Sequence, residues 1–247
     1  MKHLILFSIL LFLFSCKKAE DRTCVKSAGD NSKLEISLES FDKISVGPKI
    51  EVELIQSSQN KIVIHGSKNL IGLISYDINS EGQLVLKNKN KCDYLRKYSK
   101  NKIKVEVYFV NLSDLHFEGT YDLTTRGIIN TPDIKLNIQD GGGTVYLNLN
   151  CTRVTANQGH GYGDFVLKGT CQDAYLRLTS NGFCNTKELS VSNSIYVISN
   201  TPVRSSVNLD NANAFVEING SGNVEYIGLP NSLSLNIFST GSLVKID

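Results

Sequence analysis

The chain has 247 residues, with 26 Lys and Arg, 24 Asp and Glu, and a formal net charge of +2. Such a balanced charge argues against a nucleic-acid-binding protein, which normally carries a strongly basic face. Tryptophan is absent, only 4 residues are proline, and 19 glycines are spread among short apolar runs. This composition is typical of an all-β protein with many tight turns.

Residues 1–16 form a predicted export signal. Lys2 precedes an apolar run from Leu4 to Phe14, which is short for a membrane-spanning helix. The ending Leu-Phe-Ser-Cys resembles a bacterial lipobox, which implies cleavage before Cys16 and lipid chains on its thiol and new amino group. The alternative is an ordinary signal peptide with an incidental cysteine. We expect an outer-membrane lipoprotein of the cell envelope, held by Cys16 and facing the periplasm or the outside, with residues 17–35 as a flexible tether.

Residues 36–110 predict an N-terminal β region. Ile50, Val52 and Leu54 alternate with acidic residues, which is the period of two expected of a half-buried strand. The basic stretch from Lys87 to Lys104 is interpreted as a solvated loop rather than a nucleic-acid patch. The sequence leaves open whether this region is an irregular start to the repeats that follow or a packed subdomain.

Residues 111–247 repeat with a step of about twenty residues. Alternating apolar trios begin near 134, 154, 176, 195, 216 and 233. A repeat this short cannot bury its own apolar face, so the pattern predicts a β-solenoid in which stacked coils share one core. The predicted inward residues are Leu136, Ile138, Ala156, Leu176, Leu178, Val197, Val216, Ile218 and Leu235.

Glycine-rich corners follow the same step. Sharp corners favour glycine because it adopts backbone angles closed to other residues, and stacked corners leave little room for side chains. The predicted corners are 22, 20, 21, 19, 19 and 19 residues apart, at Gly119, Gly141, Gly161, Gly182, Thr201, Gly220 and Ser239.

Several segments resemble the family described as putative auto-transporter adhesin, head GIN domain. That family repeats a Gly-Ala-Gly-Asp-like core after an alternating strand, and the segments GYGD at 161–164 and GSGN at 220–223 match it. The opening FDKISV at 41–46 and the bridge NKIKVEVYFVNLSDLHFEG at 101–119 also match. The resemblance covers 40–247 and implies a right-handed, β-helix-like solenoid with a role in adhesion.

The sequence contains little that indicates a catalytic or metal-binding site. Pectate-lyase-type β-helices need clustered carboxylates for calcium and a basic residue to abstract a proton. Asp122, Asp140 and Asp164 lie at corners and could stack, but acidic residues at turns more often satisfy backbone donors. The histidines lack short-spaced partners. We therefore expect no catalytic residue, no metal and no cofactor.

Two function classes follow from these observations. The leading hypothesis is a non-enzymatic adhesion or binding module held at the membrane by its lipid anchor, with a glycan or a surface protein as partner. The alternative is a carbohydrate-active β-helix that binds or cleaves polysaccharide. Repeat surfaces display outward side chains in rows one coil apart. The predicted binding surface is Tyr146, Tyr162 and Tyr226, and the competing interpretation is that these rings pack between coils.

Cysteine spacing suggests contact between coils. Cys151 and Cys171 are twenty residues apart, which places them on neighbouring coils about 4.8 Å from one another. Export makes a disulfide between them possible, although direct parallel stacking strains its geometry. The alternative is a pair of small buried thiols.

Overall fold

A computed structural model describes residues 27–90 and 102–246 of the chain. Over these residues the fold is almost entirely β, with strands joined in one 18-stranded hydrogen-bonded arrangement and one short helix, α2 (Lys68–Ile71). Within the two described ranges, no helix has the length and apolar character needed to cross a membrane. The all-β prediction is confirmed.

The strands of the first half are short and follow the predicted alternation. They are β1 (Asn31–Ser37), β2 (Lys43–Val46), β3 (Glu51–Gln56), β4 (Lys61–Ser67), β5 (Ile74–Ile78), β6 (Gln83–Asn88), β7 (Lys104–Phe109), β8 (Asp114–Phe117) and β9 (Leu123–Thr125). The later strands include three long, bent ones. They are β10 (Ile129–Ile138), β11 (Thr144–Gln158), β12 (Asp164–Leu178), β13 (Cys184–Ser199), β14 (Ser205–Asn208), β15 (Asn213–Ile218), β16 (Val224–Ile227), β17 (Ser232–Ile237) and β18 (Leu243–Lys245).

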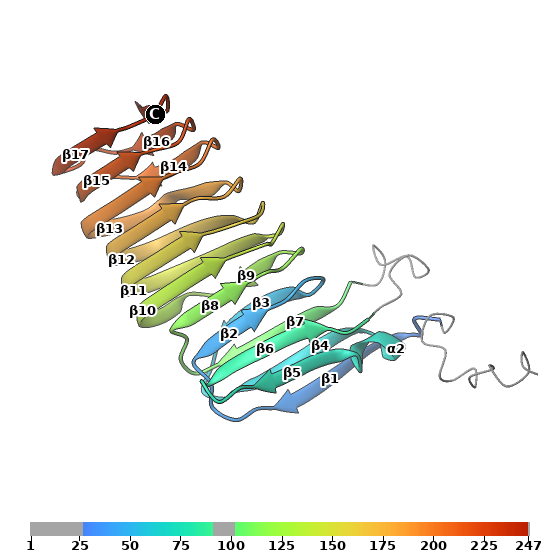
Figure 1. The fold of residues 1–247 in the computed structure, drawn as a ribbon. Helices are drawn as coiled ribbons and strands as arrows, with labels where there is room; N and C mark the ends of the chain where they lie inside the picture. Colours follow the sequence, from blue (N-terminus) through green and yellow to red (C-terminus); the bar gives the residue numbers. More distant parts are fainter. Residues whose placement is uncertain (1–26, 91–101, 247) are drawn as a thin grey trace, which may run out of the picture.

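The chain winds into a solenoid of about 7 turns (Figure 1). Neighbouring coils pair in parallel, so that Val154 of β11 lies opposite Ala174 of β12, which lies opposite Ile195 of β13. These partners are 20 and 21 residues apart in the sequence. The predicted step of about twenty residues is therefore confirmed.

Two broad faces of the solenoid run along its length. Sheet 1 contains β1, β4, β7, β3, β9, the first parts of β11, β12 and β13, and then β14, β16 and β18. Sheet 2 contains β5, β6, β2, β8, the last parts of β10, β11, β12 and β13, and then β15 and β17. The first part of β10 and the middle parts of β11, β12 and β13 form a third side.

The inward side chains of these faces form one continuous apolar core. Eight of the nine residues predicted to face inward are buried, namely Leu136, Ile138, Ala156, Leu176, Leu178, Val197, Val216 and Ile218. The ninth, Leu235, lies on the inward side as predicted but is 40% exposed. Leu235 is in register with Val216 of the preceding coil, but no described coil covers its other side.

Antiparallel strands close the N-terminal end of the solenoid. β1 runs antiparallel to β4, which runs antiparallel to β7, and β5 runs antiparallel to β6. Helix α2 lies at the same end (Figure 1), and its Lys68 N–H donates to the Asp30 carbonyl at 2.8 Å. Because β2 and β3 also pair in parallel with β8 and β9, the buried residues of 36–110 belong to the same core as the coils.

The glycine corners are sites where successive coils touch. Gly141 and Gly161 form a parallel backbone bridge, and a Cβ added to Gly220 would lie 2.2 Å from the Thr201 carbonyl oxygen. Of the predicted corner glycines, only Gly161 has a positive φ, of 100°. Lack of space between coils, rather than unusual backbone angles, explains most of the corner glycines.

Candidate binding surface

The three tyrosines of the predicted binding surface do not share one face. Tyr146 and Tyr162 are 41% and 69% exposed. Tyr146 points outward on sheet 1, in a row of paired residues that continues to Glu225 of β16. Tyr226 is the next residue in that strand, so it points the other way and packs against the core. A single exposed row through these three tyrosines is therefore not formed.

A different aromatic row lies on the outer face of sheet 2. Tyr175, Tyr196 and Phe215 occupy the same position in three successive coils, and we call them the aromatic ladder. The ring centroids of Tyr175 and Tyr196 are 6.0 Å apart, with planes tilted by 34°. Tyr196 and Phe215 stack at 4.6 Å, with planes 6° apart, and each is 40% exposed. The ladder therefore joins coils and also presents an aromatic surface.

The sequence contained a signal for this ladder that the tyrosine prediction did not use. Tyr175 lies between Ala174 and Leu176, two inward residues of one strand, and Tyr196 and Phe215 occupy the equivalent place in their strands. Period-two alternation turns that middle position outward. Aligning the middle positions of the repeats, rather than the inward ones alone, would have found the row.

A shallow groove runs along the solenoid axis beside the aromatic ladder. This axial groove has a volume of about 430 Å³ and is lined by residues of three coils. Tyr175 and Tyr196 form one side, while Arg153, Asp173 and Asn193 form the other. The groove thus combines an aromatic wall with a polar wall.

Contacts between coils hold the polar wall of the axial groove in place. Arg153 lies 3.7 Å from Asp133 in the preceding coil and 4.0 Å from Asp173 in the following one. Asn193 donates from Nδ2 to Asp173 Oδ1 at 2.8 Å. Hydrogen-bonding groups therefore repeat along the groove at the coil spacing of about 4.8 Å.

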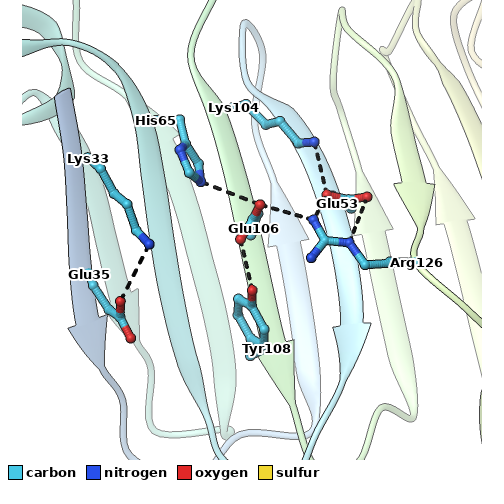
Figure 2. A network of polar contacts seen from close by, with 8 residues as sticks. All are labelled: Lys33, Glu35, Glu53, His65, Lys104, Glu106, Tyr108 and Arg126. Carbon is cyan, nitrogen blue, oxygen red and sulfur yellow. Dashed lines mark hydrogen bonds and ion pairs between the residues drawn. The ribbon is translucent and has the colours of Figure 1, made fainter. Parts of the chain in front are cut away.

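A second candidate site lies on the outer face of sheet 1, near the N-terminal end. Figure 2 shows it as a polar cluster, and we call six of its members the charged network: Glu53, His65, Lys104, Glu106, Tyr108 and Arg126. Arg126 donates from Nε to Glu53 at 3.2 Å and from Nη2 to Glu106 at 3.0 Å. Each carboxylate also has further partners, because Lys104 Nζ lies 2.9 Å from Glu53 and Tyr108 donates to Glu106 at 2.9 Å.

The contacts of the charged network lower the pKa of both carboxyl groups. The hydrogen bond from Arg126 is the main reason that the pKa of Glu53 is lowered. At Glu106 burial acts to raise the pKa, but the hydrogen bonds from Tyr108 and Arg126 outweigh it and the pKa is lowered. A general base works best when its pKa is near the working pH. These two ionised, paired carboxylates are therefore poor proton acceptors. The network joins β3, β4, β7 and the residue that follows β9.

The corner carboxylates hold backbone groups rather than a metal. Thr144 N–H donates to Asp122 at 3.1 Å and Phe183 N–H donates to Asp164 at 2.6 Å. For Asp122 and Asp164 the interpretation that these side chains satisfy backbone donors is confirmed, with the donors supplied by the next coil. In residues 27–90 and 102–246, no three His, Cys, Asp or Glu side chains gather as metal ligands.

Cys151 and Cys171 are direct partners in adjacent coils. Both are buried free thiols that line a hollow of about 400 Å³ on the third side of the solenoid. The contact with Cys151, together with burial, raises the pKa of the Cys171 thiol. A disulfide between them stays a prediction. Cys16, Cys24 and Cys92 lie outside the described residues.

Comparison with known families tests the resemblance noted in the sequence. The family model described as "Putative auto-transporter adhesin, head GIN domain" matches residues 40–230. The chain belongs to this family. Membership in a family of adhesins indicates a protein of the cell surface or envelope and favours a binding role over catalysis.

Several solved structures with the same fold come from Bacteroidetes. A putative adhesin from Bacteroides fragilis is similar with a TM-score of 0.73 and 21% identity, over 88% of this head GIN chain and 97% of that one. A putative adhesin from Parabacteroides distasonis has a TM-score of 0.63 and 19% identity, over 88% and 98%. A putative lipid binding protein from the same species has a TM-score of 0.61 and 17% identity, over 89% and 98%. At such identities the likeness shows the fold alone. None of the curated proteins compared with the chain matches it.

Proposed function

We propose that this head GIN domain protein is a non-enzymatic adhesion module of the cell envelope that binds carbohydrate with the outer face of sheet 2. The observation behind the proposal is the aromatic ladder, in which Tyr196 and Phe215 remain 40% exposed although they stack on each other. Exposed aromatic rings on a rigid sheet supply a large contact area with little loss of conformational entropy. Membership in an adhesin family supports the same role.

The axial groove suits a sugar chain because its two walls differ in chemistry. A sugar ring has apolar C–H faces and a rim of hydroxyl groups, so it can lie against Tyr175 and Tyr196 while hydrogen bonding to Asp173 and Asn193. Binding sites usually combine an apolar surface with a few placed polar groups in this way. Since the polar groups repeat from coil to coil, the ligand we propose is a glycan chain that runs along the solenoid axis.

A glycan array tests the ligand class. We expect binding to a subset of polysaccharides, with the bound sugar recovered unchanged. If no glycan is bound and the protein instead binds a protein on the surface of host or neighbouring cells, the carbohydrate proposal is wrong and the surface-protein alternative replaces it.

The alternative function, a carbohydrate-active β-helix, would use the charged network. This cluster contains basic and phenolic groups beside two carboxylates, the residue types that abstract protons in polyuronate cleavage. Arg126 and Lys104 already occupy Glu53, and Arg126 and Tyr108 occupy Glu106, so the carboxylates have partners without a ligand. Release of unsaturated sugars from a polyuronate would overturn the non-enzymatic proposal.

We also propose that lipid on Cys16 holds the module at the membrane. The support is the lipobox-like ending of the signal, and multiple acyl chains give a stable anchor. Labelled palmitate should enter the wild-type protein and fail to enter a Cys16→Ala variant. Equal labelling of both would contradict the anchor. Protease treatment of intact cells then separates the surface orientation, in which the protein is digested, from the periplasmic one, in which it is protected.

A further inference from the structure

The last described coil exposes the apolar interior of the solenoid. β17 is exposed along its whole length and, within the described chain, pairs only with β15. Leu233, Leu235 and Ile237 are 42%, 40% and 44% exposed. Their partners in β15 are almost fully buried. The difference arises because an inward residue of a coil inside the stack is covered from both sides along the axis.

The composition of β17 gives no protection against strand pairing. Ser232–Ile237 reads SLSLNI, with no charged residue, proline or glycine. Edge strands in soluble proteins normally carry a charge, a proline or a bulge that prevents pairing with another chain. Terminal repeats of solenoids normally carry a polar face for the same reason. The neighbouring Phe238 is 72% exposed and extends this apolar edge.

The opposite end of the solenoid is built differently. There the outermost strand of sheet 2, the sheet that contains β17, is β5, which runs antiparallel to β6 and carries the exposed Asp77. In sheet 1 the outermost strand is β1, which carries Lys33 and Glu35. A charge on an edge strand opposes pairing with another chain. Asp77 therefore makes β5 a poorer partner for β17 than a second, uncharged β17, and stacking the C-terminal end of one molecule on the N-terminal end of the next is disfavoured.

We propose that β17 pairs antiparallel with β17 of a second copy of this chain, giving a two-fold symmetric, end-to-end dimer. An antiparallel pair places opposed residues on the same side of the sheet. If Leu235 lies at the two-fold axis, it opposes Leu235 of the second copy, and Leu233 opposes the second copy's Ile237. The leucines and isoleucines of both copies then continue one core, while Ser234 and Asn236 stay outward. The strand is uncharged, so self-pairing meets no like-charge repulsion. A two-fold interface of this kind closes on itself and cannot extend into a fibre.

The mass of the purified full chain in solution tests this inference, independently of any ligand. We expect twice the chain mass at about 50 µM for the wild type and the single mass for Leu235→Lys. The matched control is Ile128→Lys, since Ile128 is an equally apolar side chain, 53% exposed, in the turn before β10. It should remain a dimer. A monomeric wild type, or a dimeric Leu235→Lys variant, would overturn the proposal.

Cross-linking provides a second test that does not depend on how well a lysine is tolerated. In a background with Cys24 and Cys92 changed to serine, Leu235→Cys should form a disulfide-linked dimer under mild oxidation. Leu233→Cys should not cross-link to itself, because the two copies of that residue would lie four residue positions apart along the paired strands. Cross-linking of Leu233→Cys with no cross-linking of Leu235→Cys would rule out the proposed register.

Discussion

The ring of Tyr196 stacks on the ring of Phe215 with centroids 4.6 Å apart and planes 6° from parallel. The two residues are 19 positions apart in the sequence but occupy neighbouring coils of the solenoid. This stacking shows how a repeat of about twenty residues turns single aromatic positions into a continuous surface. It also means that each ring has two roles, because it contacts the next coil and is partly open to a ligand.

The structural role of the aromatic ladder predicts a measurable loss of stability. A stacked aromatic pair contributes about 0.5–1.5 kcal/mol beyond the area that it buries. Tyr196 contacts a ring on each side, so Tyr196→Ala should lower the free energy of unfolding in urea by about 1–3 kcal/mol. Tyr162→Ala is the control, since Tyr162 lies at a corner with 69% of its surface exposed, and it should change the value by less than about 0.5 kcal/mol. Equal effects would contradict a stabilising ladder.

The corner glycines predict a strong dependence on position. A methyl group at Gly220 would lie 2.2 Å from the carbonyl oxygen of Thr201, which belongs to the preceding coil and cannot move without separating the coils. Gly220→Ala should therefore lower the free energy of unfolding by about 3 kcal/mol or more, at the upper end of overpacking effects. Gly142→Ala provides the matched control at another corner, because a Cβ there meets no atom within 4 Å. If both variants unfold at the same urea concentration, close contact between corners is not the reason for glycine.

The charged network predicts acid sensitivity with a defined sign. The folded state lowers the pKa of Glu53 and Glu106 below the ordinary value of 4.5, so their contribution to stability is present above that pH and is lost as the pH falls below it. Arg126→Met removes the shared cation, so the variant should unfold more readily than the wild type at neutral pH. The difference between the two should shrink as the two carboxylates become protonated.

Thermal unfolding measured from about pH 7 to pH 3 checks the network prediction. The control is Arg204→Met, since Arg204 contacts a single carboxylate, that of Glu225, at 3.5 Å and is largely exposed. The Arg204→Met variant should differ little from the wild type in its unfolding temperature at every pH. A difference between wild type and Arg126→Met that stays constant over the whole range would show that Arg126 does not act through the two glutamates.

The pairing of Cys151 with Cys171 predicts a disulfide under oxidising conditions. Oxidation by a disulfide reagent would remove one hydrogen from each thiol, reduce the reagent and close a loop of about twenty residues, which is worth roughly 3 kcal/mol. We expect the oxidised protein to resist alkylation at these two positions after denaturation, while Cys184, which is buried away from them, is alkylated. If all three cysteines are alkylated, Cys151 and Cys171 have remained free thiols and the disulfide prediction is wrong.

Much of the fold could be predicted because solenoid coils repeat the same local pattern. The apolar alternation in residues 134–138 and its recurrence every twenty residues required no long-range information. The exposure of Leu235 could not be predicted in this way, because its pattern is the same as that of Val216 and only its place at the last described coil differs. The antiparallel pairing at the N-terminal end could not be predicted either, because alternation within β4 does not show whether the neighbouring strands run parallel or antiparallel to it.

The binding surface was harder to predict than the fold. Tyr146, Tyr162 and Tyr226 are grouped in the sequence as outward residues of the repeats, but one residue of offset within a strand turns Tyr226 inward. The register that aligns Tyr175 with Tyr196 includes irregular steps in β12 and β13, which the sequence alone does not place. The charged network was missed because it joins β4, β7, β3 and β9, which are not consecutive in the chain.

The most direct test of the proposed function is the dissociation constant of the best array glycan for three forms of the protein. The wild type is compared with a Tyr175→Ser/Tyr196→Ser double variant and with Tyr162→Ser, each shown to be folded at the temperature used. We predict at least tenfold weaker binding for the double variant, equivalent to about 1.4 kcal/mol, and unchanged binding for Tyr162→Ser. Equal affinity of the wild type and the double variant would contradict a binding site on the aromatic ladder.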